Sequence, residues 1–333
     1  MTVSFCVIAY NEEKFLENLF MDIRKQDYPH ELMEVVFVNA MSTDNTKKMM
    51  LNFAAEDNGF IRVIVRDNLK RRQSAGWNVA ITSAKEDIIL RIDAHTKIPS
   101  DFVSKSVCAI ERGESIVGGA RPNIVDEDTP WKRTLLLAEG SMFGSGIAPF
   151  RSSQNESYVK SVFHGAYRRE VFKKAGLFNE NLGRTEDNEM HFRIRKSGYK
   201  IYYDPRIVSY QHIRPTLCDM LKQKFGNGLW IGLTMGVCPQ CFSWYHFVPM
   251  TFVLAMIATF IMFCFENRLF FLMLIFLYFL VDLLMSLVAA KCKKKYWQYL
   301  LLPIIFPLLH VSYGLGTLIG VVRMPFWKKR IET

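Results

Sequence analysis

Three long apolar runs near the end of the 333-residue chain restrict its fold more than any other feature. They cover residues 245–265, 269–290 and 299–322, and Asp282 is the only charged residue in them. A helix of about 20 apolar residues is long enough to cross the hydrocarbon core of a bilayer. Buried helices of soluble proteins rarely follow one another at such lengths. The sequence therefore predicts that residues 241–333 form a membrane region with two or three transmembrane segments.

Basic residues gather around these runs. Nine Lys and Arg residues but three acidic residues lie between Tyr245 and Thr333, so much of the net charge of +10 is concentrated there. Anionic lipid headgroups explain such a cluster, and nothing in the sequence resembles a nucleic-acid-binding module. We therefore expect membrane lipid, and no nucleic acid, as a partner.

The start of the chain bears on the orientation of this region. The apolar run 3–9 is too short for a secretory signal and lacks a preceding basic segment, so we expect the N-terminal domain, residues 1–240, in the cytosol. Lys291–Lys295 then lies inside, as the positive-inside rule requires, but a third crossing would place residues 327–330 outside. Helix breaks at Pro303 and Pro307 would instead give an interfacial piece and a re-entrant piece. Two and three crossings both remain open.

The seven cysteines are odd in number and scattered along the chain, which argues against a disulfide framework. Cys238 and Cys241 have CxxC spacing, but no second pair or nearby histidine cluster completes a zinc site. We therefore expect these two residues to be free thiols near the membrane surface.

Short apolar runs rich in β-formers alternate with helical patterns in the first part of the chain. Strands are expected at 3–9, 34–38, 61–65 and 87–92, and helices at 11–23, 45–56 and 74–84. This order predicts an α/β fold with a mainly parallel, Rossmann-like sheet covered by helices on both faces. A further strand is expected at 207–211. The helical pattern at 217–233 fits either an interfacial membrane helix or an ordinary core-facing helix.

Polar side chains follow the expected strands where each of them ends. They are Asn11 and Glu12, residues 39–44, and residues 93–95. Ligands of parallel sheets bind at the carboxyl ends of the strands, so these residues are candidate binding groups. The chain has no GxGxxG, which weakens a nicotinamide-binding interpretation, and no GxxxxGK[ST], which excludes the common P-loop.

Five short motifs, in their order along the chain, resemble those of family 2 glycosyltransferases with the GT-A fold. They are residues 7–13 (VIAYNEE), 42–46 (STDNT), 73–78 (QSAGWN), 91–95 (RIDAH, where the family has its DxD element) and 185–189 (TEDNE, matching its acidic ED element), with Arg193 and residues 198–200 continuing the last. The resemblance covers roughly residues 3–230. The Asp-Ala-His variant and residues 310–316 (HVSYGLG) are most similar to the succinoglycan-biosynthesis type of bacterial membrane glycosyltransferase.

The resemblance implies a site for a nucleotide diphosphate sugar, expected to be UDP-linked, formed by Ala9, Asn11, Glu12, Asn39, Asp44, Arg71, Arg72 and Asp93. Glu12 and Asp44 suit hydrogen bonds to base and ribose, but Glu12 also fits a solvated acid and Asp44 a helix cap. Asn39 stands where the family often has an acid, which changes how the base is recognised. Arg71 and Arg72 can clamp a phosphate or form a solvated basic loop.

The resemblance also implies a divalent cation, held by Asp93 and His95 against the diphosphate. Imidazole suits Mn²⁺ better than Mg²⁺, so the histidine shifts the expected preference toward manganese. The alternative is that His95 only donates a hydrogen bond to phosphate or backbone.

Asp187 is the predicted catalytic base, which takes the proton of the acceptor hydroxyl in an inverting reaction. Neighbouring Glu186 and Glu189 are expected to raise its proton affinity, and the alternative is a merely acidic helix start. The predicted acceptor-side residues are His164, Gly165, Glu186 and Trp230, although His164 equally fits a structural histidine. Gln223 and Trp230 do not form the QxxRW element of processive synthases, which favours transfer of a single sugar.

The predicted function is transfer of one sugar to a polyprenyl-linked saccharide in exopolysaccharide or capsule biosynthesis, at the plasma membrane, alongside other polysaccharide-assembly proteins. Transfer to polyprenyl phosphate or a glycolipid is one alternative, and an inactive scaffold in a polysaccharide export complex is another. Asp282 and His310 lie inside the apolar runs, where they are expected to contact each other or lipid headgroups, or to pack inside the protein.

Overall fold

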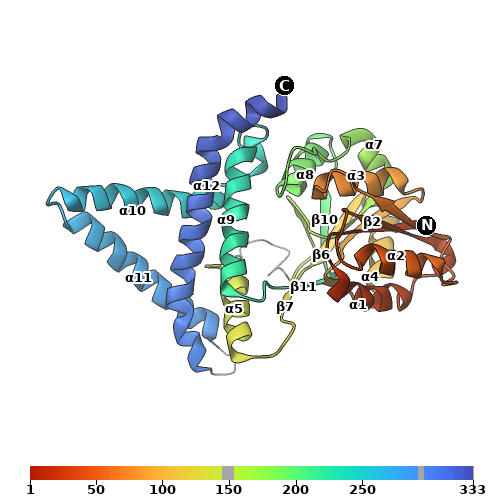
Figure 1. Ribbon diagram of the computed structural model, residues 1–333, viewed down its shortest axis with the longest axis horizontal. Helices are drawn as coiled ribbons and strands as arrows, with labels where there is room; N and C mark the ends of the chain where they lie inside the picture. The colour runs from red at the N-terminus through yellow and green to blue at the C-terminus, as the bar shows by residue number, and fades with distance from the viewer. Residues whose placement is uncertain (145–153, 292–295, 333) are drawn as a thin grey trace. The chain divides into compact units, whose positions relative to one another are not determined.

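The computed structural model describes residues 1–144, 154–291 and 296–332, and it divides into two compact units (Figure 1). The first unit consists of Met1–Pro122 and Pro149–His212, and the second of Asn123–Ala148 and Ile213–Thr333. The basic cluster expected on the cytosolic side falls, except for Lys291, outside the described residues.

An eight-stranded sheet forms the centre of the first unit. Its strand order is β3-β2-β1-β4-β9-β6-β10-β8, built from β1 (Val3–Ala9), β2 (Met33–Asn39), β3 (Arg62–Asp67), β4 (Ile88–Asp93), β6 (Ile116–Ala120), β8 (Ser157–Val159), β9 (Gly165–Arg168) and β10 (Ile201–Val208). The first four strands in this order are parallel, as are β6 and β10, whereas β9 and β8 run antiparallel to their neighbours. The predicted mainly parallel sheet is therefore confirmed.

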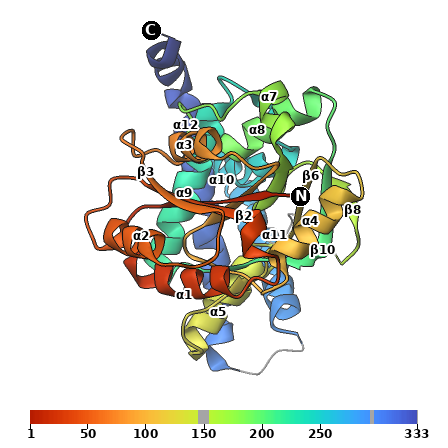
Figure 2. The same cartoon turned by 90° about the vertical axis from the view of Figure 1, so that its right-hand side faces the viewer.

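Helices cover both faces of the sheet, because alternate residues of each strand point to opposite sides. On β1, Phe5 and Val7 pack with one apolar cluster and Cys6 with the other. The first cluster includes residues of α1 (Glu13–Arg24), α2 (Thr46–Ala55) and α4 (Phe102–Glu111), and the second those of α3 (Gln73–Ser83), α7 (Arg169–Ala175) and α8 (Glu186–Lys196). Figure 2 shows α1 and α2 on one side and α3, α7 and α8 on the other.

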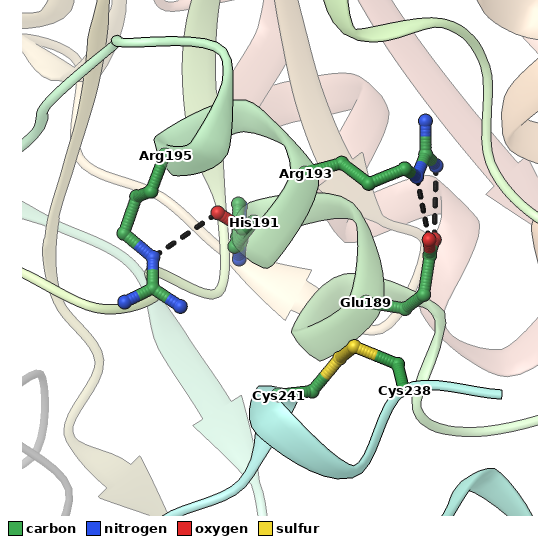
Figure 3. Close-up of a disulfide and its surroundings, with 6 residues drawn as sticks. All are labelled: Glu189, His191, Arg193, Arg195, Cys238 and Cys241. Atoms are coloured by element: carbon green, nitrogen blue, oxygen red, sulfur yellow. Dashed lines mark hydrogen bonds and ion pairs between the residues drawn. A yellow bond between two sulfur atoms is a disulfide. The ribbon is translucent and has the colours of Figure 1, made fainter. Parts of the chain in front are cut away.

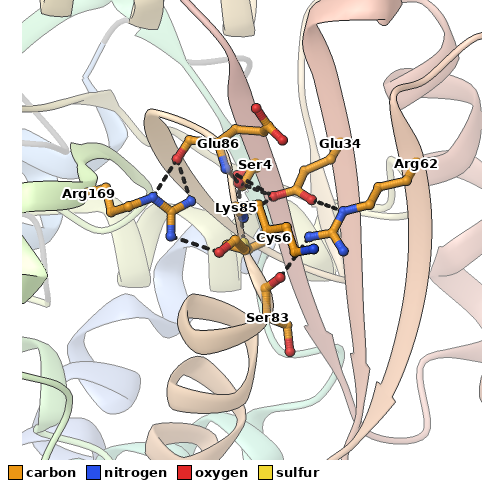
Figure 4. Close-up of polar contacts among 9 residues, drawn as sticks. Ser4, Cys6, Glu34, Arg62, Ser83, Lys85, Glu86 and Arg169 are labelled. Carbon is orange, nitrogen blue, oxygen red and sulfur yellow. Dashed lines mark hydrogen bonds and ion pairs between the residues drawn. The ribbon is translucent and has the colours of Figure 1, made fainter.

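A polar network ties the connections together at the amino ends of the strands (Figure 4). The fully buried Glu34 of β2 accepts hydrogen bonds from the Ser4 hydroxyl, the Lys85 amide and the Arg62 guanidinium. Arg169 donates to the backbone oxygens of residues 84 and 86. This network is structural, because it lies at the edge of the sheet opposite to the predicted binding residues.

The predicted strand at 207–211 is wrong in extent. The chain instead forms the longer β10, then breaks at Ser209 and continues as β11 (Tyr210–His212), which pairs antiparallel with β5 (Thr96–Lys97). The break follows from an irregularity beside β6, where the register shifts between Asp204 and Val208 and the Ser209 amide donates to the Ala120 oxygen over 2.9 Å.

The second unit is helical. After the short strand β7 (Asn123–Ile124) it contains α5 (Pro130–Gly140), α9 (Leu217–Thr234), α10 (Val248–Cys264), α11 (Leu269–Ala290) and α12 (Leu302–Glu332). Three helical segments of the described chain are long and apolar enough to cross a membrane, namely Trp244–Cys264, Leu269–Ala290 and Trp297–Glu332. These correspond to the three predicted runs.

The expected breaks at Pro303 and Pro307 are wrong, because α12 continues through both prolines. Pro303 lies in the first turn, where backbone N–H groups have no partner within the helix. Pro307 lies further inside the helix and is accommodated without ending it.

One face of α9 packs closely along α12, as the core-facing alternative for residues 217–233 requires. A Cβ atom added at Gly228 would lie 2.1 Å from the Tyr313 oxygen, and one added at Gly316 would lie 2.2 Å from the Phe225 oxygen. His310 also packs inside this unit, since its Nδ1 lies 2.8 Å from the Tyr278 hydroxyl and its Nε2 2.5 Å from the Phe143 oxygen. The expected contact between His310 and Asp282 is not what these distances show.

The prediction of free thiols at Cys238 and Cys241 is wrong, because the two residues form a disulfide (Figure 3). They lie at the short 3₁₀ turn η2 (Pro239–Cys241), which brings their Cα atoms to 5.6 Å. That separation lies within the usual range for a disulfide.

Candidate active site

The carboxyl ends of the first four strands meet at one edge of the sheet. Ala9 pairs with Asn39, Ile8 pairs with Asp93, and Asn39 pairs with Asp67 of β3. The predicted donor-binding residues of the first, second and fourth strands therefore lie side by side, as the parallel order requires.

The loops after β1 and β2 are joined by hydrogen bonds. Asn11 has a φ of +56°, a conformation that asparagine tolerates better than most residues. Its side-chain Oδ1 accepts a hydrogen bond from the Thr43 backbone amide over 2.8 Å, and its backbone amide donates to the Ser42 hydroxyl over 3.0 Å. The Glu12 amide donates to the Thr46 hydroxyl over 2.8 Å. These contacts fix the backbone from which the Glu12 side chain extends.

Asp44 caps two helices. Its carboxylate accepts from the amide of Thr46, the first residue of α2, over 3.0 Å, and from the amide of Glu13, the first residue of α1, over 3.2 Å. Burial would raise the pKa of Asp44, but the hydrogen bonds from Thr46 and Glu13 outweigh it and lower the pKa. The helix-cap alternative for Asp44 is thus observed, and it leaves a carboxylate at the edge of the site.

The buried Asn39 links two strand ends. Its side-chain amide donates to Asp67 Oδ1 over 3.0 Å, and its Oδ1 accepts from the Ser42 amide over 3.0 Å. Lys47 Nζ lies 2.6 Å from Asp67 Oδ2. The hydrogen bonds from Asn39 and Lys47 lower the pKa of Asp67. Sequence reasoning missed Asp67 because the third strand was taken to end at Val65, two residues too early.

The two arginines before α3 differ in their surroundings. Both are exposed, but Arg72 donates to the backbone oxygen of Glu180 over 2.9 Å, whereas Arg71 has a φ of +55°. Ser74 and Asn78 hold the same segment, since they donate to the oxygens of Leu182 and Phe178 over 3.0 and 2.9 Å. Arg72 therefore helps to position the chain that leads to α8.

Asp93 and three neighbouring groups form the deepest part of the strand edge. Asp93 is 9% exposed, and its Oδ2 lies 3.8 Å from His164 Nε2. Burial alone would raise the pKa of Asp93, but His164, His95 and Arg91 outweigh it and lower the pKa to about 2. His95 Nδ1 lies 3.0 Å from Glu12 Oε1. Asp93 is thus a buried carboxylate that stays ionised at neutral pH.

His164 satisfies the structural alternative and also borders the site. Its Nδ1 lies 2.8 Å from the Ser209 hydroxyl and its Nε2 3.3 Å from the Thr96 hydroxyl. Burial lowers the pKa of His164, so the ring is neutral at neutral pH. Gly165, the next residue, begins β9 and is buried.

Asp187 lies in the first turn of α8 and is held by a buried cation. Arg91 Nη2 donates to Asp187 Oδ1 over 2.8 Å, and the Arg91 side chain is 2% exposed. Its guanidinium carbon lies 4.3 Å from the ring centroid of Trp77 and 4.5 Å from that of Phe178. Burial would lower the pKa of Arg91, but Asp187 and Tyr167 outweigh it and raise it, so the charge is permanent.

The two acids beside Asp187 add little negative charge, because Glu186 is protonated and Glu189 is paired with an arginine. Burial and the charge of Asp187 raise the pKa of Glu186, so the 2% exposed Glu186 holds its proton well above the usual range. Glu189 forms an ion pair with Arg193, whose Nη2 lies 2.9 Å from Glu189 Oε2 (Figure 3). Of these three acids, Asp187 is therefore the one whose carboxylate is held by Arg91 of β4 rather than by a partner on α8.

Trp230 belongs to the second unit and is not among the residues that the first unit brings together. Its ring contacts that of Trp327, with centroids 6.0 Å apart. Its predicted acceptor role therefore stays a prediction.

A segment of the chain that includes the strand edge and Asp93 at the end of β4 matches a known family, and α8 begins just beyond this segment. Residues 4–176 match the family model described as "Glycosyl transferase family 2". The chain belongs to this family. It is a glycosyltransferase, and the sheet described above is the GT-A fold.

Two curated relatives illustrate the range of this family. The chain is 30% identical over 234 residues to the succinoglycan biosynthesis protein ExoA of Rhizobium meliloti (strain 1021), covering 68% of each chain. It is 24% identical over 320 residues to the dolichyl N-acetyl-alpha-D-glucosaminyl phosphate 3-beta-D-2,3-diacetamido-2,3-dideoxy-beta-D-glucuronosyltransferase of Methanococcus voltae, covering 94% of this chain and 95% of that one.

A solved structure shares the fold. The mannosyltransferase PcManGT from Pyrobaculum calidifontis, in complex with GDP-Man and Mn²⁺, superimposes with a TM-score of 0.60 at 16% identity, covering 95% of this chain and 86% of that chain. The family model and the Rhizobium relative confirm the family resemblance predicted from the motifs.

The residues present fit a divalent cation, such as the Mn²⁺ bound in the Pyrobaculum mannosyltransferase. Asp93 supplies an ionised, buried carboxylate and His95 an imidazole two residues further on. Across the described ranges, no group of three or more His, Cys, Asp or Glu side chains surrounds a common ion position. Two protein ligands suit a cation whose remaining ligands come from substrate phosphates and water.

Arg91 belongs to the fourth family 2 motif, residues 91–95, but no role was predicted for it from the sequence. Its position was the available signal, since Arg91 is a charged residue within the apolar run 88–92, two residues before Asp93. Residues two apart on a strand share a face of the sheet. Arg91 therefore places Asp187 on the same face as Asp93.

Proposed function

We propose that this glycosyltransferase transfers one sugar, with inversion and with the help of a divalent cation, from a UDP-linked donor to a polyprenyl-linked saccharide. The observation that carries the proposal is the pairing of Asp187 with Arg91, two residues before Asp93 on β4. It supports a donor-binding carboxylate and a candidate base on one face of the sheet edge.

On the donor side, Asp93 and His95 would hold Mn²⁺ or Mg²⁺, and Glu12 orients the His95 ring through Nδ1. When bound, the cation neutralises charge on the diphosphate leaving group. Ala9, Asn11, Asn39, Asp44 and Asp67 surround the neighbouring strand ends. They offer backbone, amide and carboxylate groups for base and ribose, while the exposed Arg71 is available to a phosphate.

On the acceptor side, Asp187 accepts the proton of the sugar hydroxyl. The hydroxyl oxygen forms a bond to the anomeric carbon while the bond from that carbon to the diphosphate oxygen breaks. A single displacement of this kind inverts the anomeric centre. Arg91 binds Oδ1 and orients the carboxylate toward the acceptor, while the protonated Glu186 keeps a second negative charge away from it.

The acceptor class is supported by the relatives. The Rhizobium relative is named for succinoglycan biosynthesis, and the Methanococcus relative is named for transfer to a dolichyl-linked amino sugar phosphate. Three apolar helical segments would keep such a lipid-linked acceptor close to the enzyme. We propose a multi-pass plasma membrane protein with a cytosolic catalytic domain that works beside other polysaccharide-assembly proteins.

The test replaces Asp187 by Asn in the full chain in native membranes and counts radiolabelled sugar in extracted lipid from a panel of nucleotide sugars. We expect transfer to fall by about 10²–10⁴-fold, and chelation of divalent cations to abolish transfer by the unchanged enzyme until Mn²⁺ or Mg²⁺ is restored. Asp101→Asn is the matched control, because Asp101 is a half-exposed acid before α4 that pairs with Lys105 and lies outside the predicted site.

Full turnover by the Asp187→Asn variant would exclude this residue as the base. Label in bare polyprenyl phosphate would redirect the proposal to a different acceptor. Complementation of polymer synthesis by the Asp187→Asn variant would favour an inactive scaffold. The anomeric configuration of the product, measured by NMR, decides between inversion and retention.

A further inference from the structure

The helices α10 and α11 form a hairpin that projects from the rest of the second unit (Figure 1). Phe260 and Phe271 contact each other near its tip, with ring centroids 5.5 Å apart. The connection between the helices contains Glu266 and Arg268, which are exposed. Most of the apolar side chains on both helices are also exposed. A hairpin that is apolar along its length and charged at its tip is suited to cross a bilayer.

The hairpin is attached to α12 at two places, near the start of α10 and at the end of α11. Near the start of α10, Pro249 and Val253 pack against Gly314, where an added Cβ atom would lie 2.3 Å from the Pro249 oxygen. At the end of α11, Ala289 and Ala290 pack with the cluster that contains Leu302 of α12. Figure 1 shows α10 leaving α12 near its middle and α11 returning to its first turns.

These two attachments determine how α12 can lie in a membrane. The start and the end of a crossing hairpin are on the same side of the bilayer. Leu302 and Gly314 are about 18 Å apart along the helix axis, since each residue adds about 1.5 Å. If α12 crossed the bilayer, these two residues would differ greatly in depth. If α12 instead runs along the membrane surface, both residues lie at the same depth and each can contact one end of the hairpin.

The exposed face of α12 fits this orientation. Side chains at i, i+4, i+11, i+18 and i+22 lie on one side of the helix, and here they are apolar and exposed: Ile304, Leu308, Leu315, Val322 and Phe326. The opposite side packs on α9 through Gly316 and Gly320. A larger share of α12 than of α10 or α11 is buried inside the protein, as expected for a helix with one lipid-facing side.

We propose that α12 lies in the membrane interface and that α10 and α11 alone, among the described segments, cross the bilayer. The docking partner of the exposed α12 face is a lipid surface with anionic headgroups. Lys328, Lys329 and Arg330 then lie on the same side as Lys291, so both basic clusters satisfy the positive-inside rule. This inference rests on the proposed membrane attachment and is independent of the transfer reaction.

The test measures depth directly in the full chain. Leu308→Cys, Leu315→Cys and Val322→Cys are made separately in a background whose other reactive cysteines are replaced by serine, labelled with a nitroxide, and reconstituted in phosphatidylethanolamine–phosphatidylglycerol vesicles. The three sites share one helix face and span about 21 Å along it. We expect their depths to agree within a few ångströms.

The matched control uses Leu254→Cys and Ile261→Cys on α10, which have the same seven-residue spacing and are both exposed. Their depths are expected to differ by up to about 10 Å, depending on the tilt of α10. A steady gradient of depth from residue 308 to residue 322 would overturn the proposal. The proposal would also be overturned if the cysteines of Glu332→Cys and Asn267→Cys reacted with a membrane-impermeant reagent from the same side of the bilayer.

Transfer activity is not a readout in either measurement, so failure of the proposed function leaves this inference intact. Conversely, an α12 that crosses the bilayer would leave the assignment of Asp187 and Asp93 unaffected.

Discussion

At the scale of single residues, Arg91 lies in the middle of a strand but acts at its end. It is buried between Trp77 and Phe178, and its guanidinium donates a hydrogen bond to the carboxylate of Asp187 in the first turn of α8. Its role is positional, because it contacts Asp187 rather than the reacting atoms. A positional role predicts that replacing Arg91 lowers kcat more than it changes KM, and that lysine recovers part of the lost activity.

Arg91→Gln is expected to lower kcat by at least about tenfold with a smaller effect on KM, because the Asp187 carboxylate loses the donor that orients it. Arg91→Lys retains a cationic donor and is expected to recover part of the lost kcat. Arg66→Gln, an exposed arginine on β3, is the control. An unchanged kcat in a folded Arg91→Gln variant would contradict the assignment.

Glu186 gives a prediction about stability. Its pKa is raised in the folded protein by burial and by Asp187, so the folded state holds the proton more tightly than the unfolded state. The stability that this provides is complete below the ordinary pKa of a glutamate and is lost as pH rises through the raised value.

Glu186→Gln removes this dependence. Relative to the natural chain, the variant is expected to gain about 1 kcal/mol or more in free energy of unfolding between mildly acidic and mildly alkaline pH. Thermal unfolding at a series of pH values measures the difference. If the stability of the two proteins had the same pH dependence, Glu186 would not bind its proton more tightly in the folded state.

Residues at strand ends could be predicted from the sequence, whereas their partners could not. Asp93 and Asp187 stand in recognisable motifs, and the parallel order of the strands places Asp93 at the binding edge. The Asp67–Asn39 and Arg91–Asp187 pairs join residues 28 and 96 positions apart, and no local pattern indicates such contacts. A charged residue inside an apolar strand, here Arg91, is the sequence signal from which such a role could have been predicted.

At the scale of elements, the strands and helices up to β4 follow from the apolar pattern, because β1, β2 and β4 are continuous buried apolar runs and α1 buries one apolar face. Periodicity failed at β10, where Pro205 and the register shift interrupt the pattern. At α12 the apolar run was predicted correctly but the proline breaks were not, because close packing against α9 stabilises the helix around Pro307.

The α9–α12 pair gives a packing prediction. Gly228→Val would place side-chain atoms against the Tyr313 backbone, since the Cβ atom alone lies 2.1 Å from its oxygen. We expect the second unit to lose about 1–3 kcal/mol of stability, measured as earlier thermal unfolding in detergent. Gly140→Val is the control, because nothing lies within 4 Å of a Cβ atom added there. Equal effects of both substitutions would contradict close helix packing.

At the scale of the whole molecule, the chain does not build its two units one after the other. Residues 123–148 leave the first unit between β6 and β8 and contribute α5 to the second unit. This excursion was not visible in the sequence, because the partners of α5 are α9 and α12, far along the chain. A division based on composition therefore finds the membrane helices but not the segment of the N-terminal half that packs with them.

A chain truncated after His212 tests this dependence. It keeps α5 but loses the helices that cover Leu135 and Ala138, which are fully buried in the complete protein. It also loses Lys224, whose Nζ lies 2.7 Å from Glu139 Oε2 in a buried ion pair. Removing one partner of such a pair costs about 3–5 kcal/mol unless the remaining charge reaches water.

We therefore expect residues 1–212 to aggregate, and Leu135→Gln to restore part of their solubility, as measured by size-exclusion chromatography. In the complete chain the same substitution should do the opposite, since it places an amide in the apolar cluster of the second unit. The sign reversal between the two chains is the decisive result. A soluble, monomeric 1–212 fragment without the substitution would show that α5 does not need the membrane helices to cover it.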